Sequence, residues 1–175
     1  INLINPQNPQ HRIEAITAEN KDNYPIDFIG ALAYDSINNG MWIGANQGLF
    51  FYDLKHKQLC SPFANRAAED IRGCIGSIID KNGQLWIGCL DGVYIIDLHS
   101  RPASSSDGVF RYRHLKYKLD DPSSGLIEKI CCFYEAQDGI LWLGSNGYGI
   151  YKCMQDERGE VQFICYNSLH GLPDN

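Results

Sequence analysis

The sequence predicts an all-β protein built from a four-stranded unit that occurs three times, and three observations carry this prediction. The three Trp residues of the chain, Trp42, Trp86 and Trp142, share one repeated context: "NGMWIGANQG", "GQLWIGCLDG" and "GILWLGSNGYG". Around them, short apolar segments rich in Ile, Val and aromatic side chains alternate with Gly, Asn and Asp turns, which is typical of antiparallel strands. No segment keeps a 3.6-residue apolar period over about twelve residues, so helices are not expected.

Each unit is predicted to contain four strands. The first strands span 28–34, 74–80 and 129–135, the second 41–45, 85–89 and 141–145, the third 48–54, 92–98 and 149–154, and the fourth 57–63, 109–117 and 161–167. The Trp residues are 44 and 56 residues apart. The Ser-rich segment "HSRPASSSDG" (99–108), a predicted surface loop, accounts for the longer interval. The remaining period of about 45 residues is typical of a propeller blade.

The predicted fold is therefore a β-propeller fragment with about three complete four-stranded antiparallel blades plus one extra outer strand. The expected segments are 1–23 (the outer strand "HRIEAIT" of a preceding blade and a connector), 24–66, 67–122 with its loop 99–108, and 123–168 (three blades), and 169–175 (a connector to a further blade). Propellers close with about four to eight blades. We therefore expect a piece of a larger protein that buries its open blade faces and edges by self-association or against the remaining blades.

Two residue types of the repeat are expected to serve packing. Trp42, Trp86 and Trp142 would fill the space between adjacent blades, because a large ring buries much apolar surface. Gly44, Gly88 and Gly144, two residues after each Trp, would let neighbouring backbones approach closely, because they carry no Cβ. These six residues are predicted to be structural.

Composition excludes several classes of function. A net charge of −6 argues against nucleic-acid binding, which needs clustered Lys and Arg. No apolar run is long enough to span a bilayer. None of the seven cysteines forms a C-x-x-C pair, so no structural zinc site, and no metal or cofactor, is expected. The adjacent Cys131 and Cys132 should point to opposite sheet faces, which favours two small buried side chains over a disulfide.

Candidate binding residues lie in the loops that join the second to the third strand and one blade to the next. A rigid scaffold presents such loops on one face, where ligands usually bind. The candidates are Asn46, Gln47, Asp70, Arg72, Asp91, Glu128, Lys129, Asn146 and Tyr148. Tyr148, an inserted aromatic between glycines, is the favoured one because its ring could stack on a sugar or aromatic ligand. The alternative for each is an ordinary solvated turn residue.

Other motifs point away from catalysis. The basic segment "RYRHLKYK" (111–118) could bind an anion such as a sulfated oligosaccharide, but an outer strand whose charges protect its edge is the favoured interpretation. None of the five histidines recurs with an acidic partner at a fixed offset, and no phosphate loop, H-E-x-x-H or G-x-S-x-G motif is present. No catalytic residue is therefore assigned.

The repeated segments "DSINNGMWIGANQGLFFYDL", "DKNGQLWIGCLDGVYIIDL" and "AQDGILWLGSNGYGIYKC" resemble the two-component regulator propeller repeat, and "LHGLPDN" resembles its connector. The resemblance covers about residues 24–175, with Asn39, Ala136 and the extra Tyr148 as departures. It implies a periplasmic sensor region of a bacterial hybrid two-component regulator, anchored by a membrane segment and followed by a histidine kinase and often a DNA-binding output. It also implies that the chain senses glycan-derived oligosaccharides and has no catalytic activity of its own.

Two other functions remain open at this point. The first is a propeller that acts as a protein-interaction or dimerisation scaffold and binds no small molecule. The second is an enzyme of the streptogramin-lyase type, whose repeats look similar. Such a lyase would need a His and acidic residues around a metal, and no His of this sequence lies in a loop between a second and a third strand.

Overall fold

The structure is a computed structural model that describes residues 2–4, 13–15, 26, 28–60, 62–63, 71–101, 110–116, 129–156, 158 and 160–173. Within these ranges the chain forms β-strands and short 3-10 helices but no α-helix. The same part of the chain holds no helix that is long and apolar enough to cross a membrane. The all-β prediction is confirmed.

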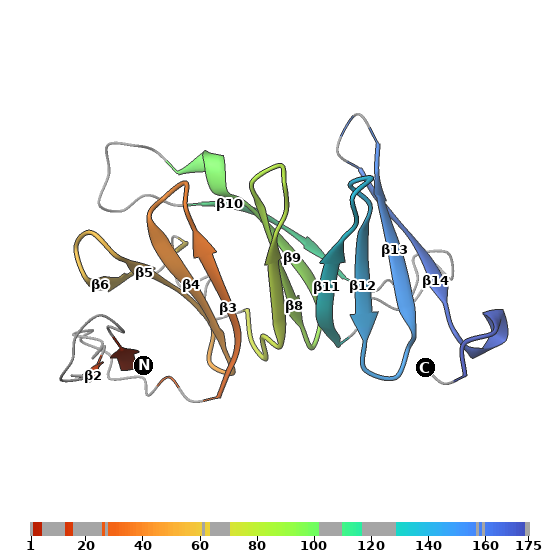
Figure 1. The fold of residues 1–175 in the computed structure, drawn as a ribbon, viewed down its shortest axis with the longest axis horizontal. Coiled ribbons are helices and arrows are strands. Elements are labelled where there is room, and N and C mark those ends of the chain that lie inside the picture. Colours follow the sequence, from red (N-terminus) through yellow and green to blue (C-terminus); the bar gives the residue numbers. More distant parts are fainter. Residues whose placement is uncertain are drawn as a thin grey trace.

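Three four-stranded antiparallel sheets, called blades 1 to 3 here, make up the fold (Figure 1). Blade 1 consists of β3 (Ile29–Asp35), β4 (Gly40–Ala45), β5 (Leu49–Asp53) and β6 (Gln58–Cys60). Blade 2 consists of β7 (Gly76–Ile79), β8 (Gln84–Cys89), β9 (Gly92–Asp97) and β10 (Arg111–Leu115). Blade 3 consists of β11 (Ile130–Glu135), β12 (Leu141–Ser145), β13 (Ile150–Gln155) and β14 (Val161–Tyr166). Consecutive strands pair in every sheet, so the predicted set of three complete blades is confirmed.

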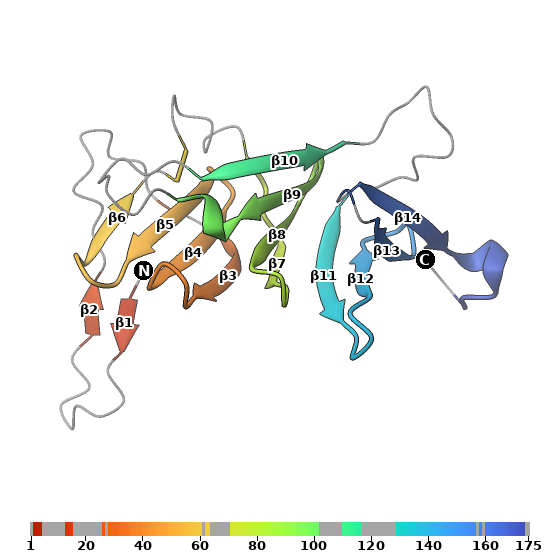
Figure 2. The ribbon, with the colours of Figure 1, turned by 90° about the horizontal axis from the view of Figure 1, so that it is seen from above.

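The blades stand side by side like the segments of a fan, as Figure 2 shows from above. The first strands, β3, β7 and β11, lie closest to one another and form the inner side. The connections leave the blades on two faces. We call the face that carries the β3–β4, β7–β8 and β11–β12 turns the turn face, and the opposite face, with the β4–β5, β8–β9 and β12–β13 connections, the loop face.

The N-terminal segment differs from the prediction of a single outer strand. A strand does lie in 11–17, namely β2 (Ile13–Ala15), but it pairs with a second strand, β1 (Asn2–Ile4), in a two-stranded antiparallel sheet. The predicted extra strand is therefore present, and β1 is a further strand that the sequence did not indicate. The sequence signal was weak because β1 has three residues and carries no turn motif of the repeat.

The seams between blades are built around an Asp–Trp pair. In blade 1, the Trp42 Nε1–H donates to Asp35 Oδ2 at 3.1 Å, and in blade 2 the Trp86 Nε1–H donates to Asp80 Oδ2 at 2.9 Å. The four side chains are almost fully buried. Trp42 packs edge-on against Phe110 of blade 2, with the ring centroids 4.8 Å apart. Each pair therefore satisfies two buried polar groups while the indole fills the seam.

Blade 3 lacks this pair because Ala136 stands where the other blades have Asp. Its turn keeps the same backbone bonds, with the Gly139 N–H donating to the Ala136 carbonyl as Gly83 donates to Asp80. Trp142 is half-buried and lies beside Tyr166, with ring centroids 5.9 Å apart. Among the described residues, no further blade covers this side of blade 3.

The repeated glycines set how closely the blades approach. A Cβ on Gly88 would collide with the backbone carbonyl of Ile130 in blade 3, and a Cβ on Gly44 would lie 2.6 Å from the Cβ of Cys74 in blade 2. A Cβ on Gly144 would meet only the Sγ of Cys132 within its own blade. Two of the three glycines are therefore required by a seam.

The seven cysteines are all free thiols. The expectation that Cys131 and Cys132 are buried is wrong, because both side chains are exposed. They lie on the inner strand of blade 3, next to a register shift in the β11–β12 ladder, and no described blade covers them. Cys74 and Cys89, in contrast, are buried in blade 2 with their sulfur atoms 3.6 Å apart.

Candidate functional site

The predicted binding residues on the loop face fall into two groups. The Gly73 N–H donates to the Asn46 carbonyl at 3.3 Å, and a Cβ on Gly73 would touch the side chain of Leu90. This contact brings Asn46, Arg72 and the β8–β9 turn with Asp91 into one neighbourhood. In blade 3, the Asn146 N–H donates to the Lys129 carbonyl at 3.0 Å. Asp70 and Glu128 lie outside the described residues.

Tyr148 is not an open aromatic platform. Its side chain is partly buried and packs against the apolar cluster that joins blades 2 and 3. Its backbone is also held, because the Tyr148 N–H donates to Ser145 Oγ at 3.1 Å and the Cys165 thiol donates to the Tyr148 carbonyl. The inserted residue therefore contributes to packing in blade 3.

Asp91 lies in a polar cluster that the sequence did not indicate. The Tyr94 hydroxyl donates to Asp91 Oδ2 at 3.3 Å, and His114 Nε2 lies 3.4 Å from the same oxygen. The imidazole of His114 stacks on the Tyr94 ring at 3.8 Å. Burial lowers the pKa of His114. Burial of Tyr94, together with the negative charge of Asp91, raises the pKa of the Tyr94 hydroxyl. The cluster was missed because strand register, not sequence spacing, pairs Tyr94 with His114.

The structure also holds a groove on the turn face, between blades 2 and 3, with a volume of about 490 Å³. Such a volume lies within the range of small-molecule sites. Blade 2 contributes its β7–β8 turn, and blade 3 contributes its β11–β12 turn and the end of β13. The lining residues are Asp80, Asn82, Trp86, Glu135, Asp138, Gly139, Ile140, Leu141, Cys153, Met154, Gln155 and Asp156. Of the predicted residues that the structure describes, only the structural Trp86 lines it, and none of the binding candidates does.

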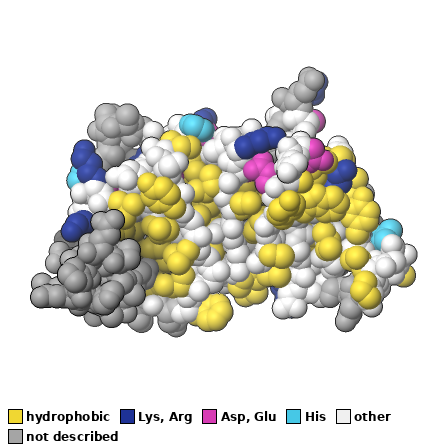
Figure 3. All heavy atoms as spheres, in the orientation of Figure 1, with side chains coloured by type: hydrophobic (Ala, Val, Ile, Leu, Met, Phe, Trp, Pro, Cys, Tyr) yellow, Lys and Arg dark blue, Asp and Glu magenta, His cyan; other side chains and the backbone are white. Residues whose placement is uncertain are grey.

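Acidic side chains dominate the rim of this groove. Each carboxylate holds a turn: Asp80 Oδ1 accepts from the Gln84 N–H at 2.8 Å, and Glu135 Oε2 accepts from the Lys81 N–H at 3.0 Å. Asp138 and Asp156 likewise accept backbone N–H bonds through one oxygen each. Figure 3 shows acidic side chains, with a basic one beside them, along the upper edge of the molecule. The groove therefore combines hydrogen-bond acceptors with negative charge.

The floor of the groove is apolar and closed. Trp86, Leu141 and Cys153 are buried there. Burial, followed by the charge of Asp80, raises the pKa of the Cys153 thiol to about 12, so this sulfur stays protonated at neutral pH. The described part of the chain contains no group of three His, Cys, Asp or Glu side chains that could hold a metal ion.

Two differences between the repeats distinguish the seam that holds the groove. The turn after Asp35 has one residue more before its Trp than the turn after Asp80. The β13–β14 connection is only five residues long, and the Asp156 N–H donates to the Glu160 carbonyl at its ends, whereas the β9–β10 connection is longer and contains a 3-10 helix. Both differences leave space between blades 2 and 3.

The fold defines the chain as a β-propeller fragment, and comparison with known proteins shows which repeat one segment of it matches. The sequence model of the two component regulator propeller family matches residues 124–147. The chain therefore carries a two component regulator propeller repeat, as the sequence resemblance predicts. No curated protein sequence matches the chain.

Solved structures share the fold at low identity. The extracellular domain of BT4673 from B. thetaiotaomicron, described as a one component system, superimposes with a TM-score of 0.56 and 17% identity over 90% of this chain and 23% of that chain. A second structure of that domain, described as part of a hybrid two component system, superimposes with a TM-score of 0.46 and 19% identity over 94% of this chain and 25% of that chain. A streptogramin B lyase superimposes with a TM-score of 0.50 and 17% identity over 95% of this chain and 49% of that chain. The chain thus spans about a quarter to a half of the length of these proteins.

Proposed function

We propose that this chain is a ligand-sensing part of the extracytoplasmic, periplasmic sensor region of a two-component regulator. The observation that carries the proposal is the match of residues 124–147 to the two component regulator propeller, on a fold shared with an extracellular domain. In this proposal the segment transmits binding and performs no catalysis. A histidine kinase elsewhere in the parent protein, anchored in the inner membrane, would provide the phosphoryl chemistry.

The proposed ligands are glycan-derived oligosaccharides. Ordered loops on a rigid scaffold, such as the two groups around Asn46 and Asn146, are suited to hydrogen-bonding sugar hydroxyls. The polar side chains exposed there are Asn46, Arg72, Asp91, Lys129 and Asn146. Because Tyr148 contributes to packing, specificity would come from these polar groups more than from aromatic stacking.

A thermal-shift screen tests the proposed ligand class. At 100 times its dissociation constant, a bound oligosaccharide adds about 2.7 kcal/mol to the free energy of unfolding, which raises the melting temperature by several degrees. The panel holds neutral and sulfated oligosaccharides, with divalent metal ions as a separate arm. We expect a shift with one oligosaccharide that Asn146→Ala and Arg72→Ala abolish. A shift with metal alone would instead favour a lyase-type enzyme, and no shift would favour a scaffold.

The parent protein offers a second check on the sensor assignment. We expect its reading frame to encode a transmembrane helix followed by a histidine kinase domain. A frame that encodes neither would contradict the assignment.

We also propose that this chain associates with a second copy through the uncovered face of blade 3. Tyr134, Trp142, Lys152 and Ile164 form one cross-strand row on that face. Tyr134 is 65% exposed and Ile164 is 41% exposed, whereas blades 1 and 2 bury the Trp residue of the equivalent face against the next blade. Such an exposed apolar patch is typical of an interaction surface. Figure 3 shows hydrophobic side chains gathered over blade 1 and over blade 3.

Light scattering measures this association directly. We expect a mass above that of one chain for the natural sequence and a monomer for Ile164→Lys, because a charge on the face disfavours its burial. The matched control is Leu169→Lys, which changes a more exposed apolar residue outside the sheet and should leave the mass unchanged. A monodisperse monomer of the natural chain would contradict the proposal.

A further inference from the structure

We propose that the groove between blades 2 and 3 binds a small organic cation, an ammonium or guanidinium group carried on a short apolar body. The inference is independent of the proposed oligosaccharide ligands, because it concerns the turn face and not the loop face. It starts from a comparison that the chain itself provides: two seams of the same repeat, of which one is filled and the other is open.

In the seam between blades 1 and 2, the chain fills the corresponding space itself. The Asn38 side-chain amide donates to the Leu98 carbonyl at 3.0 Å and links the β3–β4 turn to the 3-10 helix Leu98–Ser100 of blade 2. A Cβ on the turn glycine, Gly83, would meet the imidazole of His99 and, at 3.1 Å, the side chain of Ile37. Two side chains thus close this seam over the glycine.

The seam between blades 2 and 3 is filled less completely, because Lys81 lies over its turn glycine but no described side chain takes the place of His99. The turn of blade 2 is one residue shorter, and among the described residues between β13 and β14 there is no helix like the one that carries His99. A Cβ on Gly139, the counterpart of Gly83, would meet only the side chain of Lys81. The groove of about 490 Å³ is the result.

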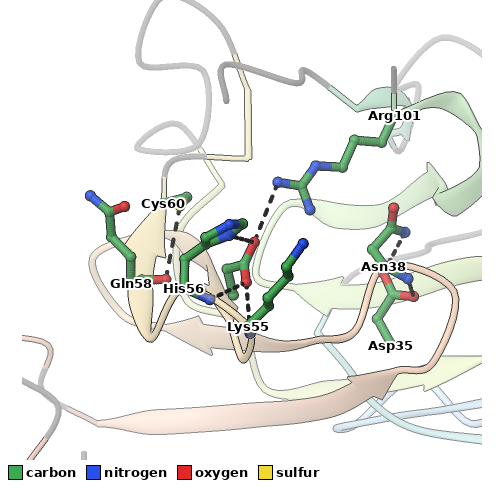
Figure 4. Close-up of polar contacts among 8 residues, drawn as sticks. Asp35, Asn38, Lys55, His56, Gln58, Cys60 and Arg101 are labelled. Carbon is green, nitrogen blue, oxygen red and sulfur yellow. Dashed lines mark hydrogen bonds and ion pairs between the residues drawn. The ribbon is translucent and has the colours of Figure 1, made fainter. Parts of the chain in front are cut away.

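The filled seam also shows which chemistry suits this environment. Just after the 3-10 helix, the Arg101 guanidinium lies 3.9 Å from Asp53 Oδ2. Figure 4 shows the Arg101 side chain extending toward the strands of blade 1. It also lies over the rings of Phe51 and Phe110, at 5.0 and 5.6 Å from their centroids. The side chain is 17% exposed. A cation between a carboxylate and apolar side chains is therefore part of the first seam, supplied by the chain.

The open seam also presents carboxylates beside apolar side chains, with the ammonium of Lys81 at its edge over Gly139. Four carboxylates, from Asp80, Glu135, Asp138 and Asp156, face an apolar floor that includes Trp86 and Leu141. Glu135, Asp138 and Asp156 each use one oxygen in the hydrogen bonds described above, which leaves the other as an acceptor. Lys81 lies at the edge over Gly139, and the charge of Arg113 also acts on Cys153 in the floor, so two cations stand against four carboxylates. An ammonium group would balance the remainder better than a neutral or anionic ligand.

The test is a titration of the full 175-residue chain followed by calorimetry, with cadaverine (1,5-diaminopentane) and agmatine as probes. The neutral analogue 1,5-pentanediol has the same apolar body without the charge. We expect millimolar or tighter binding of at least one cation and at least tenfold weaker binding of the diol. The affinity should fall with added salt, because exposed charges are screened.

Variants locate the binding. The double variant Glu135→Gln/Asp138→Asn should weaken binding about tenfold, since each exposed charge pair contributes a few-fold. Lys81→Ala should strengthen it by removing the competing cation. Asp91→Asn, a carboxylate on the opposite face, is the matched control and should have no effect. Three results would each overturn the proposal. The first is equal binding of cation and diol, and the second is no binding at about 10 mM, a concentration at which even weak sites are largely occupied. The third is an effect of Asp91→Asn as large as that of the groove variants.

Discussion

Replacing Trp86 by alanine is expected to lower the free energy of unfolding by about 3–5 kcal/mol, the usual cost of removing a fully buried Trp. The indole of Trp86 is 1% exposed and is part of the cluster that joins blades 2 and 3. Its loss also leaves Asp80 Oδ2, a buried carboxylate oxygen, without the donor it has at 2.9 Å. Since domains are stable by about 5–15 kcal/mol, this loss is a large fraction of the total free energy of unfolding.

The repeat supplies a matched control for this prediction. Trp142 has the same place in blade 3 but is half-buried and has no Asp beside it. We expect Trp142→Ala to cost about 1–2 kcal/mol, since only part of its apolar surface leaves water. Urea unfolding followed by circular dichroism measures both variants. If the two substitutions cost the same, Trp86 does not hold the seam as described.

Replacing Gly88 by alanine is expected to lower the free energy of unfolding by about 1–3 kcal/mol through overpacking, with the melting temperature falling about 2–4 °C per kcal/mol. The added methyl group would collide with the carbonyl of Ile130, which belongs to the backbone of blade 3. A backbone group cannot rotate away, so blades 2 and 3 would have to separate. The distortion would propagate to the seam that buries Trp86.

Gly144→Ala is the control at the equivalent position of blade 3. Its methyl group would meet only the Sγ of Cys132, which can rotate. We expect a change within about 0.5 kcal/mol, or a small gain, because alanine is entropically cheaper to order than glycine in a strand. Thermal unfolding measures both variants. If Gly144→Ala lowers the melting temperature more than Gly88→Ala does, the close approach of Gly88 to Ile130 does not determine the effect.

The repeat made the fold predictable from the sequence, whereas the site was not. Three copies of one Trp–Gly context fix the strands because every copy must bury the same face against a neighbour. The groove depends on differences between copies: the shorter turn after Asp80, and a tight connection after Asp156. A repeat is recognised from the residues that its copies share, so the residues in which the copies differ do not contribute to its recognition.

Individual side chains were predictable only where local spacing determines their surroundings. The buried positions of Trp42 and Trp86 were predicted in this way, whereas their hydrogen bonds to Asp35 and Asp80, seven and six residues earlier, were not. Tyr148, in contrast, was expected on an open loop, but the packing of blade 3 draws its ring against the apolar cluster. The contact of Asp91 with His114 depends on the register between β9 and β10, which is set by the whole sheet.

The single-file order of the blades has a consequence for how stability is distributed along the chain. Each blade contacts only its neighbours in sequence, so the energetics approximate a one-dimensional array in which terms add by unit and by junction. Blade 2 takes part in two junctions, and its strand β9 is buried along nearly its whole length. Blade 3 has one junction among the described strands, so it should open more readily than blade 2. A ligand that bound in the groove would therefore act on the junction between blade 2, the more stable unit, and blade 3, the less stable one.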